Sequence, residues 1–345
     1  MQKILTLSLF FLFSNTFSQS LSDLTFGGVG SFEVVTWNLE FFPKNNQTTI
    51  DSTALAISSL NADVYALQEI DDLDALQELD DLLEDYQAYV IPENYNNLTL
   101  AYLVKKDIEV VNLNSIYASS SYNNIFAGRP PLLLELLFNG SSYFLINVHL
   151  KCCGDGSLNT NDSSDEENRR LQAVNQIKTY IDSYIPNEKV IVLGDYNDLL
   201  EDNTSNNVFQ SLLDDSDSYL FADISVLDLP NSHWSFPNWP SHLDHILITN
   251  ELFDEFNNAY NYATTIKMAD YFTNGFYGYD NCISDHYPVG MRLWPFVTEI
   301  EEKKPTDKRL NQIRDIQGRI TNPQHNQIQF YFYENGTVEK SILLD

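Results

Sequence analysis

The stretch Val190-Ile191-Val192-Leu193-Gly194-Asp195-Tyr196-Asn197-Asp198 decides the fold, because it joins an apolar run of strand length to a carboxylate and an amide. Such polar groups are costly to hold at the end of a buried strand unless a charged or hydrogen-bonding partner meets them. The same arrangement recurs at other apolar runs. Three of them end in polar residues, namely Asn38, Gln68 with Glu69, and His149. A fourth run is preceded by Asp285 and His286. We therefore expect one polar site to which several strand ends contribute.

Helical and strand-like runs alternate along the chain. Apolar residues recur at helical spacing within residues 50–60, 73–83 and 171–181. Besides the runs at 32–37, 63–67 and 143–148, apolar runs of strand length lie at residues 98–104, 108–113, 132–138, 190–193, 246–249 and 289–294. Runs that are apolar at consecutive positions are typical of strands covered on both faces. The pattern predicts an α/β fold in which two mixed β-sheets pack together and are flanked by helices, a four-layer α/β sandwich.

The two ends of the chain differ from this predicted core, which spans residues 30–296. Residues 1–18 combine Lys3, an apolar run and small residues before Gln19, which is the layout of a secretory signal peptide. We therefore expect a secreted or cell-surface protein without stable membrane insertion. Residues 297–309 form a charged linker, and residues 310–345 a small β segment. Within this segment, runs at 327–333 and 338–344 flank Glu334-Asn335-Gly336-Thr337, which predicts a β-hairpin with an Asn-Gly turn.

The net charge of −30 restricts the partners of the protein. A strongly acidic surface repels nucleic acid and anionic membranes, so it excludes a protein that holds DNA by charge alone. It does not exclude an enzyme that meets phosphate through bound cations, because carboxylates are the ligands that divalent metals prefer.

Three cysteines are too few for a disulfide scaffold. In an exported protein, either Cys152 or Cys153 is a candidate to bridge to Cys282, which would tie together two loops near the predicted site, and the sequence leaves this pairing open. A vicinal disulfide is less favoured because it strains the peptide bond between the two residues, and metal binding by these thiols is the least favoured. Residues 154–168 are polar and aperiodic, which predicts a surface loop bordering the site.

The polar positions form motifs with a fixed order along the chain. They are Trp37-Asn38, Leu67-Gln68-Glu69, Asn147-x-His149-Leu150, Gly194-Asp195-Tyr196-Asn197, Ser241-x-x-Asp244-His245 and Ser284-Asp285-His286. In this order they resemble the endonuclease/exonuclease/phosphatase superfamily, over roughly residues 30–295. That group includes secreted pancreatic-type deoxyribonucleases, abasic-site endonucleases, sphingomyelinases and inositol-polyphosphate phosphatases. The resemblance implies a divalent-metal-dependent phosphodiester hydrolase.

Phosphodiester hydrolysis requires cations or donors on the phosphoryl oxygens and a group that activates water. Glu69 is a hard oxygen ligand suited to Mg²⁺, with Mn²⁺ or Ca²⁺ as alternatives, and Asn38 shares that ion or orients its water. From the residues alone, His286 is the expected general base, with Asp285 or Asp244 fixing its tautomer. The resemblance assigns Asp244 to that partnership and Asp285 to the metal.

The remaining candidates contact the reacting groups. Asp195 and Asn197 are expected to position the nucleophile and the phosphate, and Asp195 is the alternative general base. His149 is expected to donate a hydrogen bond to a phosphate oxygen. The resemblance directs Arg129, in Gly128-Arg129-Pro130-Pro131, toward the substrate phosphate.

The chain departs from two subfamilies of the superfamily. Trp37-Asn38-Leu39-Glu40 replaces the Asn-x-Asn-Gly signature of abasic-site enzymes, and Ser241-His242-Leu243-Asp244-His245 stands where inositol-polyphosphate phosphatases carry Pro-x-Trp-Cys-Asp-Arg. A secreted nuclease acting on DNA or RNA is the leading expectation. A sphingomyelinase or phospholipase C-like enzyme, or a phosphatase, is the alternative within the enzyme class.

A non-catalytic binding module is the alternative from a different class, and the intact set of motif residues argues against it. Trp234, Phe236 and Trp239 either stack on bases, reach lipid or simply pack their loop. The expected partner is a phosphodiester substrate such as nucleic acid, and no obligate protein partner is evident.

Overall fold

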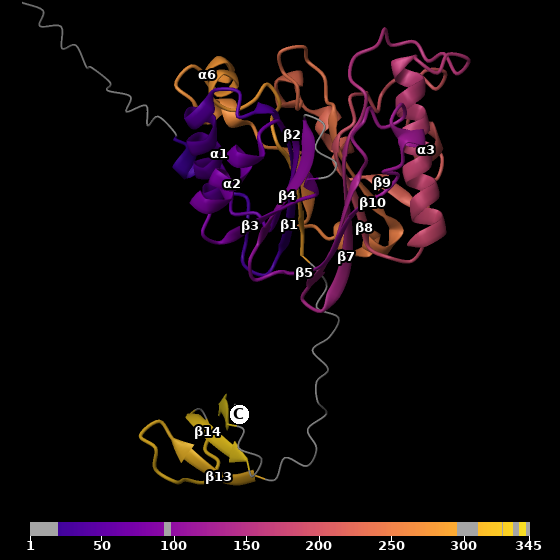
Figure 1. The fold of residues 1–345 in the computed structure, drawn as a ribbon. Helices are drawn as coiled ribbons and strands as arrows, with labels where there is room; N and C mark the ends of the chain where they lie inside the picture. The colour runs from indigo at the N-terminus through magenta and orange to yellow at the C-terminus, as the bar shows by residue number, and fades with distance from the viewer. Residues whose placement is uncertain (1–19, 93–97, 295–309, 326, 334–337, 343–345) are drawn as a thin grey trace, which may run out of the picture. The chain divides into compact units, whose positions relative to one another are not determined.

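Two six-stranded sheets packed against each other form the centre of the larger part of the chain (Figure 1). The structure is a computed structural model that describes residues 20–92, 98–294, 310–325, 327–333 and 338–342. Contacts divide the chain into two units, Met1–Pro295 and Phe296–Asp345. The predicted signal peptide (1–18), linker (297–309) and Asn-Gly turn (334–337) lie outside the described residues.

The first sheet is mixed. Its only parallel pair among the described strands is β1 with β2, and its strand order is β11 (Tyr262–Thr265), β12 (Val289–Leu293), β1 (Phe32–Phe42), β2 (Val64–Ile70), β4 (Thr99–Lys105) and β3 (Tyr86–Val90). Parallel strands need a crossover connection. The helix α1 (Asn46–Leu60) supplies it.

The second sheet repeats this plan. Its described parallel pair is β7 with β8, and its order is β5 (Glu109–Ser115), β6 (Leu132–Phe138), β7 (Ser141–His149), β8 (Val190–Asp195), β10 (Asp244–Thr249) and β9 (Tyr219–Phe221). Here the crossover contains α3 (Glu166–Tyr184). Both sheets are therefore mixed, as predicted.

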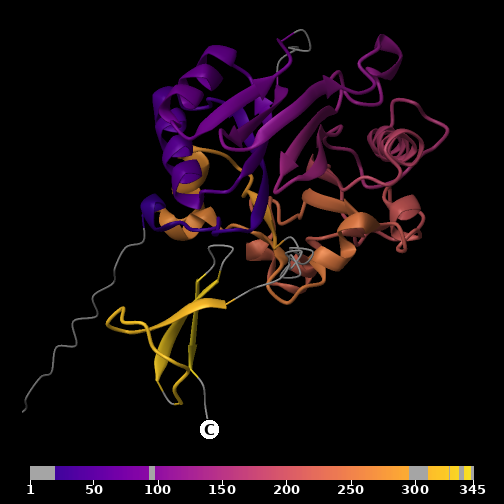
Figure 2. The same cartoon turned by 90° about the horizontal axis from the view of Figure 1, so that it is seen from below.

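Helices cover the outer face of each sheet. Figures 1 and 2 show α1, α2 (Leu73–Leu82) and α6 (Phe276–Cys282) on the side of the first sheet and α3 on the side of the second. The short helices α4 (Gln210–Leu213) and α5 (Phe253–Phe256) lie in connections that flank β9 and β10. The three helices predicted from apolar spacing are confirmed, whereas α6 was not predicted.

Three apolar clusters lie between the four layers. They form because successive residues of a strand point to opposite faces of its sheet. In β8, Ile191 and Leu193 join the central cluster between the sheets, whereas Val190 and Val192 pack in the cluster beneath α3. A third cluster lies between the first sheet and the helices α1 and α2. The predicted four-layer α/β sandwich is confirmed.

Local differences from the prediction have simple causes. β5 is largely exposed because it forms the edge of its sheet. The loop predicted at 154–168 ends earlier, since Asp165 caps α3 by accepting a hydrogen bond from the Asn168 backbone N at 2.7 Å. The strands β3, β9 and β11 were missed, and Leu24 and Phe26, which precede the predicted start at residue 30, are buried in the core.

The second unit is a three-stranded antiparallel sheet of β13 (Leu310–Asp315), β14 (Ile328–Tyr333) and β15 (Val338–Ile342). The predicted hairpin corresponds to β14 and β15. The strand β13, which the sequence analysis missed, pairs with β14 on the side opposite β15. None of the described helices is both long and apolar enough to cross a membrane.

Deleting residues 306–345 should leave catalysis by the larger unit largely intact, because every motif lies in that unit and the described strands β13, β14 and β15 form a sheet of their own. Turnover and circular dichroism of the truncated protein test this expectation. Lost turnover with retained secondary structure would instead assign the small sheet a part in the site.

Candidate active site

Strand topology brings the predicted polar residues to one edge of the sandwich. Carboxyl ends of parallel strands meet at the same edge, so Asn38 lies opposite Gln68 and His149 opposite Asp195. β10 runs antiparallel to β8 and begins at this edge, which pairs Asp244 with Asp195. The sequence places each polar residue at the end of a strand, and the pairing of these strands brings the polar residues to the same edge.

A cleft of about 500 Å³ opens at this edge. It brings together most of the predicted site residues with several that were not predicted. Its lining consists of Glu40, Phe41, Glu69, His149, Cys152, Cys153, Asp195, Asn197, Phe236, Trp239, Ser241, Leu243, Asp285 and His286.

Asn38 lies beneath the cleft and connects the two sheets. Its Nδ2 donates to Glu69 Oε1 at 3.1 Å and to Asp195 Oδ2 at 3.0 Å. Its Oδ1 accepts a hydrogen bond from the Glu40 backbone N at 2.9 Å. The two Nδ2 bonds orient the Glu69 and Asp195 carboxylates, while Oδ1 keeps a second lone pair, so the predicted part of Asn38 in holding the cation or orienting its water stays a prediction.

Asp195 is almost fully buried at the end of β8. Burial, together with the carboxylates of Asp244 and Glu69, raises the pKa of Asp195 to about 7 against the opposing effect of His286. Asn197 adopts a left-handed conformation with φ of 56°, and its backbone N donates to Asp195 Oδ1 at 2.9 Å. The turn thus leaves one carboxylate oxygen, Oδ2, facing the other site residues.

His286 forms the closest side-chain pair of the site with Asp244. Its Nδ1 lies 2.8 Å from Asp244 Oδ2, the contact that the predicted orienting role requires. Its Nε2 lies 4.0 Å from Asp195 Oδ2. Burial disfavours the imidazolium, but the carboxylates of Asp244 and Asp195 outweigh burial and raise the pKa of His286 to about 10.

This pKa differs from the sequence-based expectation for His286. A general base must be neutral to accept a proton. An imidazole surrounded by carboxylates instead holds its proton at neutral pH, which suits a phosphate contact or a proton donor. The alternative base named from the sequence, Asp195, titrates nearer neutrality.

His149 contrasts with His286, because it is neutral. Burial, and then the positive charges of Arg129 and His286, lower the pKa of His149 well below its usual value. Its Nε2 lies 3.6 Å from Asp195 Oδ2 and 3.8 Å from Glu69 Oε1, while Nδ1 has no partner. A neutral ring with a proton on Nε2 offers a hydrogen-bond donor to the cleft.

Arg129 donates to the backbone at the end of β7, and its predicted contact with the substrate phosphate stays a prediction. Its Nε donates to the carbonyl oxygen of His149 at 3.1 Å, and its Nη2 to that of Leu150 at 2.9 Å. It is absent from the residues that line the cleft. Arg129 therefore braces the segment after β7 from behind. Its charge still acts on Asp195 and Glu69.

Ser284 fixes the segment that carries Asp285 and His286. Its Oγ donates to the Asn38 carbonyl oxygen at 2.6 Å and accepts from the His286 backbone N at 3.0 Å. The backbone N of Asp285 donates to Glu40 Oε2 at 2.8 Å. These bonds tie the segment before β12 to the end of β1, and they leave the Asp285 carboxylate on the cleft.

The donor set of the cleft fits a hard divalent cation. Glu69 and Asp285 present partly exposed carboxylates to the cleft. The carboxylates of Glu69, Asp195 and Asp285 lie together in the lining of the cleft, and a bound cation would offset their negative charge. Among the described residues, Asp195, Asp244 and His286 also have ligand atoms within 4.8 Å of one another. Because His286 already pairs with Asp244, Glu69 and Asp285 remain candidate cation ligands predicted from the sequence.

Aromatic side chains form one wall of the cleft. The ring of Phe236 lies 4.8 Å from the His286 ring, and Trp239 is 78% exposed. Phe41, which was not predicted, is also exposed in the lining. Trp234 does not line the cleft, so of the predicted aromatic group Phe236 packs the loop and Trp239 is free to meet a substrate.

The predicted disulfide does not form in the structure. Cys152, Cys153 and Cys282 are all free thiols. Cys282 ends α6 and packs beside the apolar cluster between the first sheet and the helices α1 and α2, whereas Cys152 and Cys153 lie in the wall of the cleft. Cys282 is therefore not among the residues that line the cleft with Cys152 and Cys153.

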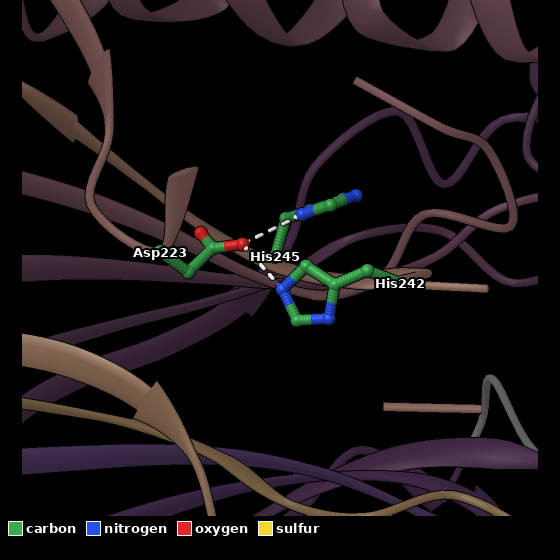
Figure 3. Close-up of side chains that lie close together, drawn as sticks. All are labelled: Asp223, His242 and His245. Carbon is green, nitrogen blue, oxygen red and sulfur yellow. Dashed lines mark hydrogen bonds and ion pairs between the residues drawn. The ribbon is translucent and has the colours of Figure 1, made fainter. Parts of the chain in front are cut away.

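A buried cluster that the sequence analysis missed lies beside β10 (Figure 3). Asp223 Oδ2 contacts His242 Nε2 at 2.9 Å and His245 Nδ1 at 2.7 Å, and all three side chains are fully buried. Asp223 Oδ1 accepts from the Ile246 backbone N at 2.7 Å. The spacing alone is compatible with a metal ion.

The hydrogen bonds favour an ion pair over a metal in this cluster. His242 Nδ1 accepts from the Ser235 backbone N at 3.2 Å, so its proton is on Nε2 and points at Asp223. A metal on Nε2 would move that proton to Nδ1, where it would face another donor. His245 donates from both nitrogens, to Asp223 and to the Asp198 carbonyl oxygen at 3.3 Å, and is therefore cationic.

The pKa shifts agree with this pairing. Burial opposes charge on His245, but the Asp223 carboxylate outweighs it and raises the pKa of His245. The two imidazoles likewise outweigh burial and hold the pKa of Asp223 below its usual range. The only sequence signal of this cluster was the pair His242 and His245 around Asp244, since Asp223 comes from a distant turn.

Comparison with known proteins agrees with the geometry of the cleft. The sequence profile of the endonuclease/exonuclease/phosphatase family matches residues 35–286. The chain belongs to this family. The predicted resemblance is thereby confirmed, as is the prediction of a metal-dependent phosphodiesterase rather than a binding module. No curated protein matches the chain in sequence.

Solved structures share the fold. TDP2 from D. rerio, in complex with a single-strand DNA product, matches with a TM-score of 0.57 and 15% identity, over 76% of this chain and 98% of that chain. The endonuclease/exonuclease/phosphatase from Bacteroides vulgatus gives 0.52 and 14%, over 76% and 98%. The human Nocturnin catalytic domain with bound sulfate gives 0.51 and 16%, over 76% and 94%. At these identities the likeness concerns the fold.

Replacing Asp223 with Asn should destabilise this family member by about 3–5 kcal/mol, since it leaves a buried cation without its partner. Because the fold lowers the pKa of Asp223, the stabilisation of the folded state by this ion pair is present at neutral pH. It is lost as pH falls through that lowered pKa. Urea unfolding at neutral pH measures the loss.

The matched control is Asp270→Asn, which breaks the exposed pair with Lys267. It should cost at most about 1 kcal/mol. Equal losses in the two variants would contradict the assignment of a buried ion pair.

Proposed function

We propose that the protein is a secreted, Mg²⁺-dependent nuclease. The observation that carries this proposal is the cleft, in which carboxylates, a neutral imidazole and a cationic imidazole from both sheets surround one space. This combination serves hydrolysis of a phosphodiester, because it supplies a cation site, a base and donors to the phosphoryl oxygens at once.

Each group has a part that its surroundings favour. Glu69 and Asp285 would hold the divalent cation, which neutralises charge on the phosphate. Asp195 accepts the proton of the attacking water, since its raised pKa gives a carboxylate of useful basicity near neutral pH. His149 donates from Nε2 to a phosphoryl oxygen, and His286 adds a positive charge that Asp244 holds in place.

A nucleic-acid substrate is supported by the wall of the cleft. Exposed aromatic rings such as Trp239 and Phe41 stack on bases of any sequence. The structural neighbour TDP2 from D. rerio was solved with a single-strand DNA product. The charge of −30 opposes general binding to polyanions, so recognition must come from the cleft and its cation.

Parallel assays of the purified protein test this proposal. The substrates are single-stranded DNA, plasmid DNA, RNA and sphingomyelin, each with Mg²⁺ and with chelator. We expect Mg²⁺-dependent cleavage of nucleic acid, with a raised KM in Trp239→Ala. Faster hydrolysis of sphingomyelin would favour the lipid phosphodiesterase instead.

Export is tested by N-terminal sequencing of secreted protein, which we expect to begin at Gln19.

Replacing Glu69 with Gln should lower turnover on the order of 10²-fold or more, because a neutral amide is a poor replacement for a charged ligand and loss of one key electrostatic contact has this magnitude. Steady-state kinetics across a Mg²⁺ titration measure the effect. The control is Glu109→Gln, on the exposed edge strand β5, which should leave turnover unchanged. Near-wild-type turnover of Glu69→Gln at saturating Mg²⁺ would refute the metal assignment.

The pH dependence of kcat/KM should show activity rising as Asp195 loses its proton, toward about pH 7, and declining in the alkaline range where His286 loses its charge. A cation at Glu69 favours ionised Asp195, so the acidic limb should move to lower pH as Mg²⁺ concentration increases.

Two variants separate the roles of these groups. Asp195→Asn should abolish turnover, whereas His286→Gln should keep the acidic limb and lose the alkaline decline. If His286→Gln removes the acidic limb, His286 is the base after all.

A further inference from the structure

Two adjacent thiols lie in the wall of the proposed catalytic cleft. Cys152 and Cys153 line it together with Glu69, His149 and Asp195. Their Sγ atoms are 3.0 Å apart, and both are unbonded. Cys153 is exposed and Cys152 is partly exposed, so both are open to small solutes that enter the cleft.

The two sulfur atoms are not equivalent. Cys153 donates its S–H to Cys152 Sγ, and Lys151 Nζ lies 3.6 Å from the same sulfur. Arg129 and Arg169 also interact electrostatically with Cys152. The reactive form of cysteine is the thiolate, and a thiol that donates its S–H to a neighbour keeps its proton. Cys152 is thus the sulfur placed to attack, and the hydrogen bond to Cys152 raises the pKa of Cys153.

A buried arginine holds this segment against the cleft. Arg170 Nη1 donates to the carbonyl oxygens of Lys151 and Cys153, each at 2.7 Å. Arg170 Nε in turn donates to Asp198 Oδ2 at 2.6 Å, three residues after Asp195. Because the backbone on both sides of Cys152 is fixed, a group attached to its sulfur stays beside the catalytic carboxylates.

We propose that Cys152 is a modification site for low-molecular-weight disulfides, and that its modification blocks the cleft. The effect on turnover rests on the proposed function, whereas the site itself does not. The Cys152 thiolate attacks one sulfur of the disulfide, the S–S bond breaks, and the leaving thiolate takes up a proton. The product is a mixed disulfide, in which Cys152 is oxidised while half of the reagent is reduced to thiol.

The mixed disulfide is the product that persists. Release of the second thiol requires Cys153 to attack Cys152, which closes an eight-membered ring around their shared peptide bond. That ring forces the peptide bond away from its planar trans form. The attached group, rather than a vicinal disulfide, therefore occupies the cleft until a reductant removes it.

The test uses the full-length protein treated with glutathione disulfide. Intact mass and peptide mapping should show one glutathione on Cys152, with turnover lost in proportion to the modified fraction and restored by dithiothreitol. Cys152→Ser should abolish both the adduct and the inhibition, whereas Cys153→Ser should retain both. The matched control is Cys282→Ser, which removes the thiol on α6 outside the cleft and should behave as wild type.

Two outcomes would overturn the proposal. An adduct confined to Cys282 or Cys153 would refute the site, and full modification of Cys152 with unchanged turnover would refute the blocking. The mass measurement needs no substrate. If the unmodified protein hydrolyses none of the tested phosphodiesters, the proposed function fails while the adduct map still decides the modification site.

Discussion

One side-chain amide, that of Asn38, joins the two sheets at the place where the chemistry is proposed to occur. It donates to Glu69 from the neighbouring strand of its own sheet and to Asp195 from the opposite sheet. A buried amide left without partners is costly, so the sheets are held at the separation that satisfies it. The cleft therefore depends on sandwich packing, and a shift of one sheet against the other would separate the proposed cation ligand from the proposed base.

A second set of buried amides fixes the same separation deeper in the sandwich. Gln68 Nε2 donates to Asn147 Oδ1 at 2.8 Å, and Asn147 Nδ2 donates to the carbonyl oxygens of Leu67 and Ala101, each at 3.0 Å. These bonds cross between the sheets in an otherwise apolar layer. Fully satisfied polar networks of this kind specify one packing arrangement, because any other leaves groups unpaired.

The distribution of charge explains how a protein of charge −30 can act on an anionic substrate. Its buried cations near the cleft are already paired or braced: His286 against Asp244, Arg129 against backbone carbonyls and Arg170 against Asp198. The carboxylates that face the cleft exceed them. In the proposed function a divalent cation would therefore meet the substrate phosphate, and the exposed aromatic residues would add contacts that do not depend on charge.

The sequence by itself determined the three longer helices, the central strands and the polar residues at their ends, because apolar periodicity is local and Asp195 or His149 must follow their strands wherever these pack. Tertiary structure decided what those residues do. Arg129 turned to backbone carbonyls, and His286 gained a raised pKa from carboxylates on other strands. Neither the absence of a disulfide to Cys282 nor the presence of the Asp223 cluster could be read from the sequence, because both depend on which distant segments the sheets bring together.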